Sequence, residues 1–169
     1  MTDLPPPILP SDRVIHHRLD ETADWVAITR LQHAYADVVD RRAWAELGEL
    51  FLPTTTVSLD LVNRPGREVV GPEAFGDFVG AAMARFEFFE FVILNAHIDL
   101  WPDGDRTSAT ARIFMCELRT VTGSTTRDDA FGLYRDRYVK VDDRWWIAER
   151  RYRSMGRFPE GVVFPLDEG

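Results

Sequence analysis

The stretch Ala27–Phe51, AITRLQHAYADVVDRRAWAELGELF, predicts a long amphipathic helix, a tight corner and a second, short helix. Its apolar residues recur at spacings of three and four and therefore share one helical face. The members of this face are Ile28, Leu31, Tyr35, Val38 and Val39. Asp40 ends the first helix, where the helix dipole disfavours a carboxylate. Three explanations stay open: Asp40 is exposed, it caps the helix that begins at Ala43, or it faces a cavity and does chemistry.

Helices come first along the chain, and strands follow them. The predicted elements of the first half are helices at about 22–40 and 43–50, a β-hairpin at 55–70 and a helix at about 72–85. From Phe86 onward the apolar residues alternate, which predicts four strands at about 88–101, 106–120, 128–141 and 144–155. Helices grouped before an antiparallel meander indicate an α+β domain. A curved sheet with helices on its inner face encloses an apolar interior, and interiors of that kind bind small molecules.

Length and charge narrow the classes of protein that fit. We place one domain at residues 20–155, between a Pro-rich N-terminal arm, 1–19, and a C-terminal tail, 156–169. A net charge of −8 argues against a nucleic-acid partner, and the lack of a run of about 18 apolar residues argues against a membrane span. The single cysteine, Cys116, and an N-terminus without signal-peptide features favour a reducing, cytoplasmic location.

Several motifs follow one another in a recognisable order. The chain opens with Ile28-x2-Leu31-x3-Tyr35-x4-Asp40 and then Trp44-x2-Leu47-x3-Phe51. Later motifs are Gly71-Pro72-Glu73, Asn95 with Ile98-Asp99-Leu100, Gly132-x-Tyr134-x-Asp136-x-Tyr138, and Trp145-x-Ile147-x2-Arg150. Over roughly residues 20–155 the chain resembles the SnoaL-like group, in the superfamily of nuclear transport factor 2, ketosteroid isomerase, scytalone dehydratase and bile-acid dehydratase. The resemblance implies a cystatin-like cone, in which a curved antiparallel or mixed sheet wraps around the N-terminal helices.

The same resemblance implies an activity. It points to a cofactor-independent lyase or isomerase, with dehydratase-like proton transfer, that acts on a small hydrophobic molecule in the cone, although the fold also hosts proteins without chemistry. In several relatives the aspartate that matches Asp40 works with a histidine at the start of the first long strand. This chain has Phe91 at that place, so the expected pair is absent there.

Three residues are candidates for catalysis. Asp40 would act as general base or acid with a pKa raised by an apolar cavity, and Tyr35 would donate a hydrogen bond to a substrate oxygen. His97 lies two residues after Asn95, on a strand whose other face is apolar. If that apolar face packs on the helices, both side chains lie on the outer face or at a dimer interface. If a bulge breaks the strand, His97 turns inward and replaces the missing histidine.

Four residues are candidates for binding the substrate, and Asn95 is the first of them. Glu117 continues an apolar face of its strand, which marks either a pocket or the point where the strand leaves the core. Tyr134 would offer a pocket hydroxyl. Arg150 matches a pocket arginine in a related dehydrochlorinase pattern and would hold an oxygen-rich ligand. The run 149–153 also fits a solvated edge strand, and this interpretation is the favoured one for the run.

The sequence has no phosphate-binding loop, nucleophile elbow or metal-ligand spacing, so we expect neither a metal nor another cofactor. Two hypotheses stand beside the enzyme: a carrier or sensor that binds a ligand without turnover, and an assembly module. In the module, aromatic side chains fill the interior, and the outer sheet face forms a homodimer or higher homo-oligomer. The sequence leaves open whether the protein turns over a substrate.

Overall fold

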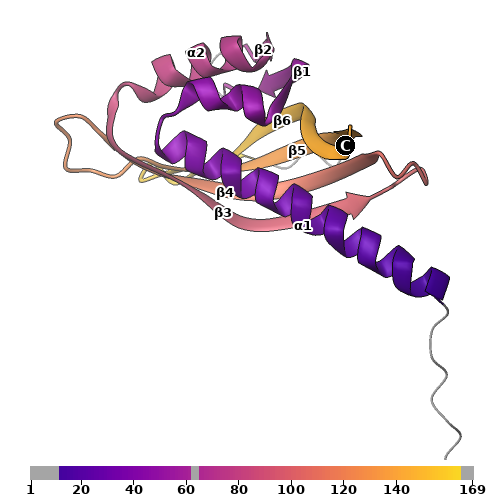
Figure 1. Ribbon diagram of the computed structural model, residues 1–169. Coiled ribbons are helices and arrows are strands. Elements are labelled where there is room, and N and C mark those ends of the chain that lie inside the picture. The colour runs from indigo at the N-terminus through magenta and orange to yellow at the C-terminus, as the bar shows by residue number, and fades with distance from the viewer. Residues whose placement is uncertain (1–11, 62–64, 165–169) are drawn as a thin grey trace, which may run out of the picture.

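The computed structural model describes residues 12–61 and 65–164 of the chain (Figure 1). In chain order the elements are α1 (Asp12–Asp40), the 3-10 helix η1 (Trp44–Glu49), β1 (Phe51–Leu59), β2 (Arg67–Val70), α2 (Pro72–Met83), β3 (Phe86–Leu100), β4 (Ser108–Val121), β5 (Asp129–Val141), β6 (Arg144–Phe158) and β7 (Val162–Val163). The predicted order of helices, hairpin, helix and four-strand meander is confirmed.

Both ends of the predicted domain differ in detail. Helix α1 begins at Asp12 rather than near residue 22, so the second part of the predicted arm is helical. The Pro-rich residues 1–11 lie outside the described residues. At the other end, β6 runs on to Phe158, and the short strand β7 pairs with it antiparallel. The last residues of the predicted tail, 165–169, also lie outside the described part of the chain.

The corner after α1 is built from backbone hydrogen bonds. Arg42 has a positive φ of 55°, and its amide donates to the carbonyl of Val39 at 3.0 Å. The next amide, of Ala43, reaches back to the carbonyl of Val38 at 2.9 Å. This pair of bonds closes the last helical turn in the way of a Schellman motif, which satisfies carbonyls that the helix end leaves free. The chain therefore turns sharply and leads into η1.

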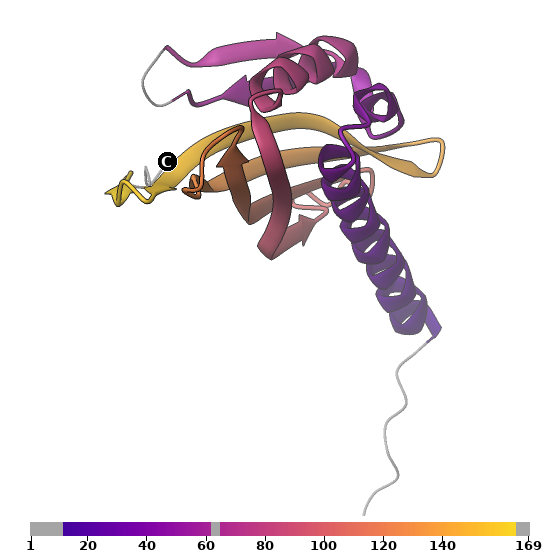
Figure 2. The ribbon, with the colours of Figure 1, turned by 90° about the vertical axis from the view of Figure 1, so that its left-hand side faces the viewer.

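One curved sheet carries the rest of the fold. Its strand order is β2-β1-β6-β5-β4-β3, in which β3 to β6 form the antiparallel meander and β1 lies parallel to β6. Figure 2 shows the long strands bending along their length, with α2 beside the β1–β2 hairpin and α1 crossing the sheet. The predicted apolar face of α1 is buried against this sheet. The α+β class and the mixed sheet are thus confirmed.

A bulge in β3 decides which side chains face the interior. The register between β3 and β4 shifts between Ile93 and Asn95, and Leu94 at the shift is 56% exposed. Before the bulge Phe91 belongs to the core, whereas after it the apolar set Ala96, Ile98 and Leu100 packs there. A bulge therefore exists, but it keeps the apolar residues inside rather than turning His97 inward.

Candidate active site

A cavity of about 550 Å³ lies between the helices and the sheet, within the range of about 300–1,000 Å³ that is typical of small-molecule sites. Helix α2 and the start of β3 form its apolar side, which includes Phe75, Phe78, Val79, Met83, Phe86, Phe89 and Phe91. Helix α1, strands β4 to β6 and the loop before β5 contribute polar groups, which include Tyr35, Glu117, Arg119, Asp128, Tyr134, Tyr152 and Arg157. Three further charged residues, Asp60, Arg85 and Glu160, also line it. The cavity lining thus combines an apolar set of side chains with a polar one.

Beneath two of the lining tyrosines lies a buried ion pair. Arg150 is 1% exposed and donates to Asp136 from Nε to Oδ1 at 2.9 Å and from Nη2 to Oδ2 at 2.6 Å. Its guanidinium carbon lies 4.1 Å from the ring centre of Tyr35 and 4.2 Å from that of Tyr134. The prediction of a solvated edge strand at 149–153 is wrong for this residue. Because β1 pairs with β6, the strand is internal, and the face that carries Arg150 points into the core.

This ion pair belongs to a chain of buried hydrogen bonds. The hydroxyl of Tyr138 donates to Asp136 Oδ2 at 2.7 Å and accepts from Gln32 Nε2 at 3.1 Å. The aspartate therefore accepts three bonds, two of them from a cation, which is the kind of pairing that a buried charge requires. Helix α1 and strands β5 and β6 are tied together under the cavity.

Tyr35 and Tyr134 remain neutral hydrogen-bond donors over a wide range of pH. Burial raises the pKa of the Tyr35 hydroxyl, while the positive charge of Arg150 opposes that rise. Burial raises the pKa of Tyr134 well above its ordinary value, and the neighbouring Tyr35 adds to the effect. Each hydroxyl can therefore donate to an oxygen atom that becomes negative during a reaction.

Glu117 supplies a carboxyl group to the cavity. Its Oε2 accepts a bond from Arg119 Nη1 at 2.9 Å, and 21% of its side chain is accessible. Burial raises the pKa of Glu117 above the usual glutamate value, and the charges of Arg119 and Arg157 oppose the rise. A carboxyl with a raised pKa in a cavity is suited to both giving and taking a proton. Of the two readings of Glu117 given above, its position corresponds to the pocket.

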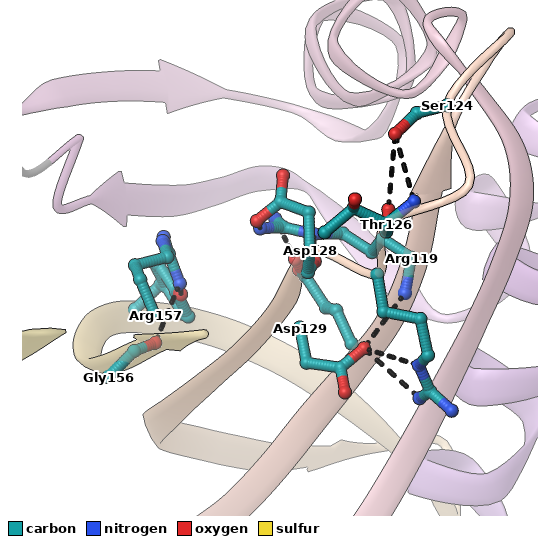
Figure 3. Close-up of polar contacts among 10 residues, drawn as sticks. Arg119, Ser124, Thr126, Asp128, Asp129, Gly156 and Arg157 are labelled. Carbon is teal, nitrogen blue, oxygen red and sulfur yellow. Dashed lines mark hydrogen bonds and ion pairs between the residues drawn. The ribbon is translucent and has the colours of Figure 1, made fainter. Parts of the chain in front are cut away.

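Arg119 forms the centre of a charged cluster at one end of the cavity (Figure 3). Besides its bond to Glu117, it donates to the carboxylate of Asp128 at 2.7 Å and to the carbonyl of the same residue at 2.6 Å. Its side chain is only 8% exposed. The cluster fixes the carboxyl of Glu117 in place while two carboxylates share one guanidinium.

Asp40 does not line the cavity. Its side chain is exposed, and Oδ1 accepts the backbone N–H of Phe91 on the edge strand β3 at 2.6 Å. Two residues later, Arg42 donates to the carbonyl of Phe86 on the same edge at 2.6 Å. The corner after α1 thus covers unpaired backbone groups of an edge strand, a protection that sheets commonly need. Burial raises the pKa of Asp40, and the bond from Phe91 opposes this.

Asn95 and His97 lie away from the cavity. Both are exposed, and His97 sits in a shallow groove on the outer sheet face with Asp99, Arg112 and Arg135. This arrangement corresponds to the alternative in which the apolar face of β3 packs on the helices. The structure therefore brings Tyr35, Glu117 and Tyr134 together around one cavity, with Arg150 behind them, and leaves Asp40, Asn95 and His97 outside it.

The lining residues that the sequence does not predict as site residues include Arg119, Tyr152 and Arg157. A signal existed for two of them. Arg119 follows Glu117 by two positions on one strand, and Tyr152 follows Arg150 in the same way, so each pair shares a face. Burial raises the pKa of the Tyr152 hydroxyl, and the nearby Glu117 adds to that rise.

Within the described ranges, no group of three or more histidine, cysteine, aspartate or glutamate side chains is arranged to hold a metal ion. No helix in the same part of the chain is both long and apolar enough to cross a membrane.

A family model of the SnoaL-like domain matches residues 20–151, and the chain belongs to this family. A candidate scytalone dehydratase from Novosphingobium aromaticivorans superposes with a TM-score of 0.70 at 21% identity, covering 88% of this chain and 92% of that one. The hexachlorocyclohexane dehydrochlorinase LinA-type3 from Novosphingobium barchaimii gives a TM-score of 0.73 at 18% identity, covering 89% and 99%. A second dehydrochlorinase of this kind, LinA Type2, gives 0.73 at 14% identity, covering 90% and 99%.

The match to the family model confirms the predicted family, and the solved structures confirm the cone-shaped fold. At sequence identities of 14–21%, the similarity to these solved structures is a similarity of fold.

Proposed function

We propose that the protein is a cofactor-independent lyase or isomerase that moves a proton on a small hydrophobic molecule in the cavity. The observation that carries this proposal is Glu117, a cavity carboxyl with a raised pKa, on the same cavity as the hydroxyls of Tyr35 and Tyr134. The apolar wall of α2 and β3 would hold the body of the molecule. The open cavity favours this function over the assembly module, in which aromatic side chains would fill the interior.

The proposed reaction begins with Glu117 as a base. Its carboxylate takes a proton from a carbon atom next to a carbonyl group, and the electron pair of that C–H bond moves toward the carbonyl oxygen. Tyr35 and Tyr134 donate hydrogen bonds to this oxygen while it becomes negative. In an isomerisation, the electron pair of the enolate takes the proton back from Glu117 at another carbon of the conjugated system. In a dehydration, that electron pair forms a C=C bond while the C–O bond of a hydroxyl on the next carbon breaks, and Glu117 gives its proton to this hydroxyl, so that water leaves.

Proton exchange on a simple ketone tests this proposal without knowledge of the natural substrate. The probe is β-tetralone in deuterium oxide. Proton NMR monitors the loss of its α-proton signal as deuterium replaces the proton. We expect the wild-type protein to accelerate the exchange and Glu117→Gln to lower the rate by about a hundredfold or more. Glu73→Gln is the matched control, because Glu73 is exposed on α2 and does not line the cavity. Equal rates for wild type and Glu117→Gln would refute the assignment.

Of two further predictions from the sequence, one is replaced here and one remains a proposal. Asp40 and His97 as a catalytic pair would require both side chains to reach the cavity, and the acid–base role is therefore proposed for Glu117 instead. A homodimer through the outer sheet face would cover the groove around His97.

A further inference from the structure

The arginines in or behind the cavity wall differ in how their charges are balanced. Arg85 lines the cavity without an ion pair to another described residue, but its side chain is exposed and its guanidinium carbon lies 4.6 Å from the ring centre of Phe86. Arg150 is bonded to Asp136, and Arg119 is bonded to both Glu117 and Asp128. Each of these two guanidinium groups has a carboxylate within 3 Å. The guanidinium groups of Arg150 and Arg119 are therefore already paired within the protein, where they hold neighbouring side chains in place.

Arg157 on β6 is different. Its Nη1 and Nη2 donate to the hydroxyl of Tyr152 at 3.3 and 3.4 Å, and Nη1 also donates to the carbonyl of Gly156 at 3.4 Å. These bonds are long, and both acceptors are neutral. Among residues 12–61 and 65–164, no carboxylate lies within ion-pair distance of this guanidinium, although the side chain is half-buried and lines the cavity. Figure 3 shows Arg157 apart from the cluster of Arg119 and Asp128.

We propose that Arg157 binds a carboxylate on the ligand, so that the ligand is an amphipathic carboxylic acid whose apolar body lies against α2 and β3. A guanidinium group matches a carboxylate with two parallel N–H donors, and such charge-assisted bonds are stronger than those to neutral oxygens. The long bonds that Arg157 now makes leave it free to exchange them for shorter ones. This inference rests on the proposed function, since it concerns the same ligand.

The acidic residues of the cavity bear on this proposal. Glu117 and Asp128 share Arg119, and Asp60 accepts the backbone N–H of Ser154 at 3.1 Å. Glu160 is exposed at the rim. A bound carboxylate would disfavour the ionised form of the nearby Glu117, whose pKa burial already raises. A bound carboxylate would therefore stabilise the protonated Glu117 that the first proton transfer forms, until that proton returns to the substrate.

A pair of ligands that differ only in charge tests the proposal. The probes are naphthylacetate and naphthylacetamide, with dissociation constants measured by calorimetry at neutral pH. We expect wild type to prefer the acid by about tenfold, which corresponds to about 1.4 kcal/mol. Arg157→Gln should abolish the preference and leave the affinity for the amide unchanged. Arg157→Lys, which keeps the charge without the planar pair of donors, should retain part of it.

Arg137→Gln is the matched control, because Arg137 is exposed on the outer sheet face and should leave the preference intact. Binding of the amide with no preference for the acid would overturn this inference alone. A preference that survives in Arg157→Gln would also overturn it, because the head group would then bind elsewhere. If neither probe binds, the proposal of a hydrophobic ligand in the cavity fails as well, whereas the exchange assay with Glu117→Gln tests the proton transfer independently.

Discussion

Replacing Asp136 by asparagine removes the counter-ion of the most deeply buried cation at the site. Arg150 is 1% exposed, and Asp136 accepts three hydrogen bonds from Arg150 and Tyr138. In Asp136→Asn an NH2 group replaces one carboxylate oxygen. This group can only donate hydrogen bonds, so it faces an N–H donor of the guanidinium without an acceptor between them. The guanidinium cannot lose its proton, and the variant is left with an uncompensated buried charge.

Breaking a buried ion pair by removing one partner costs about 3–5 kcal/mol of unfolding free energy. For a chain of this length, each kcal/mol lowers the melting temperature by about 2–4 °C, so we expect Asp136→Asn to melt about 6–20 °C below wild type. The reverse variant, Arg150→Met, leaves a buried carboxyl that can take up a proton. A buried carboxyl without its cation is also unfavourable, so Arg150→Met should unfold more easily than wild type.

Urea unfolding followed by tryptophan fluorescence measures these free energies. The double variant Asp136→Leu/Arg150→Met serves as the control, because apolar residues of similar size replace the whole pair. It should recover most of the stability that Asp136→Asn loses. If Asp136→Asn is within about 1 kcal/mol of wild type, the pair does not act as a buried ion pair, and the reasoning from its geometry is wrong.

Three further predictions concern packing, the corner after α1 and pH. Gly132→Ala should destabilise the fold by about 1–3 kcal/mol, because the added Cβ would lie 2.3 Å from the ring of Tyr152; chemical denaturation measures the loss. Asp40→Ala should cost about 1–3 kcal/mol by leaving the Phe91 N–H unpaired, whereas Asp40→Asn keeps an acceptor and should cost less, with denaturation curves of both as the check. The raised folded pKa of Glu117 means that its contribution to stability is present below the unfolded pKa and is lost as the pH rises through the folded pKa. Wild type should therefore lose stability relative to Glu117→Gln between acidic and neutral pH, and an equal pH dependence of the two proteins would contradict the raised pKa.

The parts of the fold with local signals could be predicted from the sequence. The apolar face of α1 repeats with the helical period and is buried as expected, although the helix begins about ten residues earlier than predicted. The meander alternates with a period of two, and its four strands lie close to their predicted positions. Tyr35 and Glu117 interrupt apolar patterns with polar atoms, and both line the cavity. Such residues can be recognised in the sequence because a polar side chain at a buried position of an apolar pattern is uncommon and therefore indicates a specific role.

The remaining features depend on contacts between distant parts of the chain. Arg150 looked solvated because its neighbours are charged, and only the parallel pairing of β1 with β6 makes that strand internal. The direction of His97 depends on a one-residue bulge, which exchanges the two faces of a strand. The partner of Asp40 is a backbone amide 51 residues away, and no side-chain pattern reveals it.

The ring opening of a nitrobenzisoxazole tests most directly whether Glu117 or Asp40 acts as the base of this cavity. A base removes one C–H proton from this probe, the N–O bond breaks, and a coloured cyanophenolate forms. We expect Glu117→Gln to lower the wild-type rate by about a hundredfold and Asp40→Asn to leave it unchanged, with the wild-type rate rising with pH through a carboxyl pKa above the usual glutamate value. Loss of the rate in Asp40→Asn, with the rate retained in Glu117→Gln, would contradict the assignment of Glu117 as the acid–base group of this cavity.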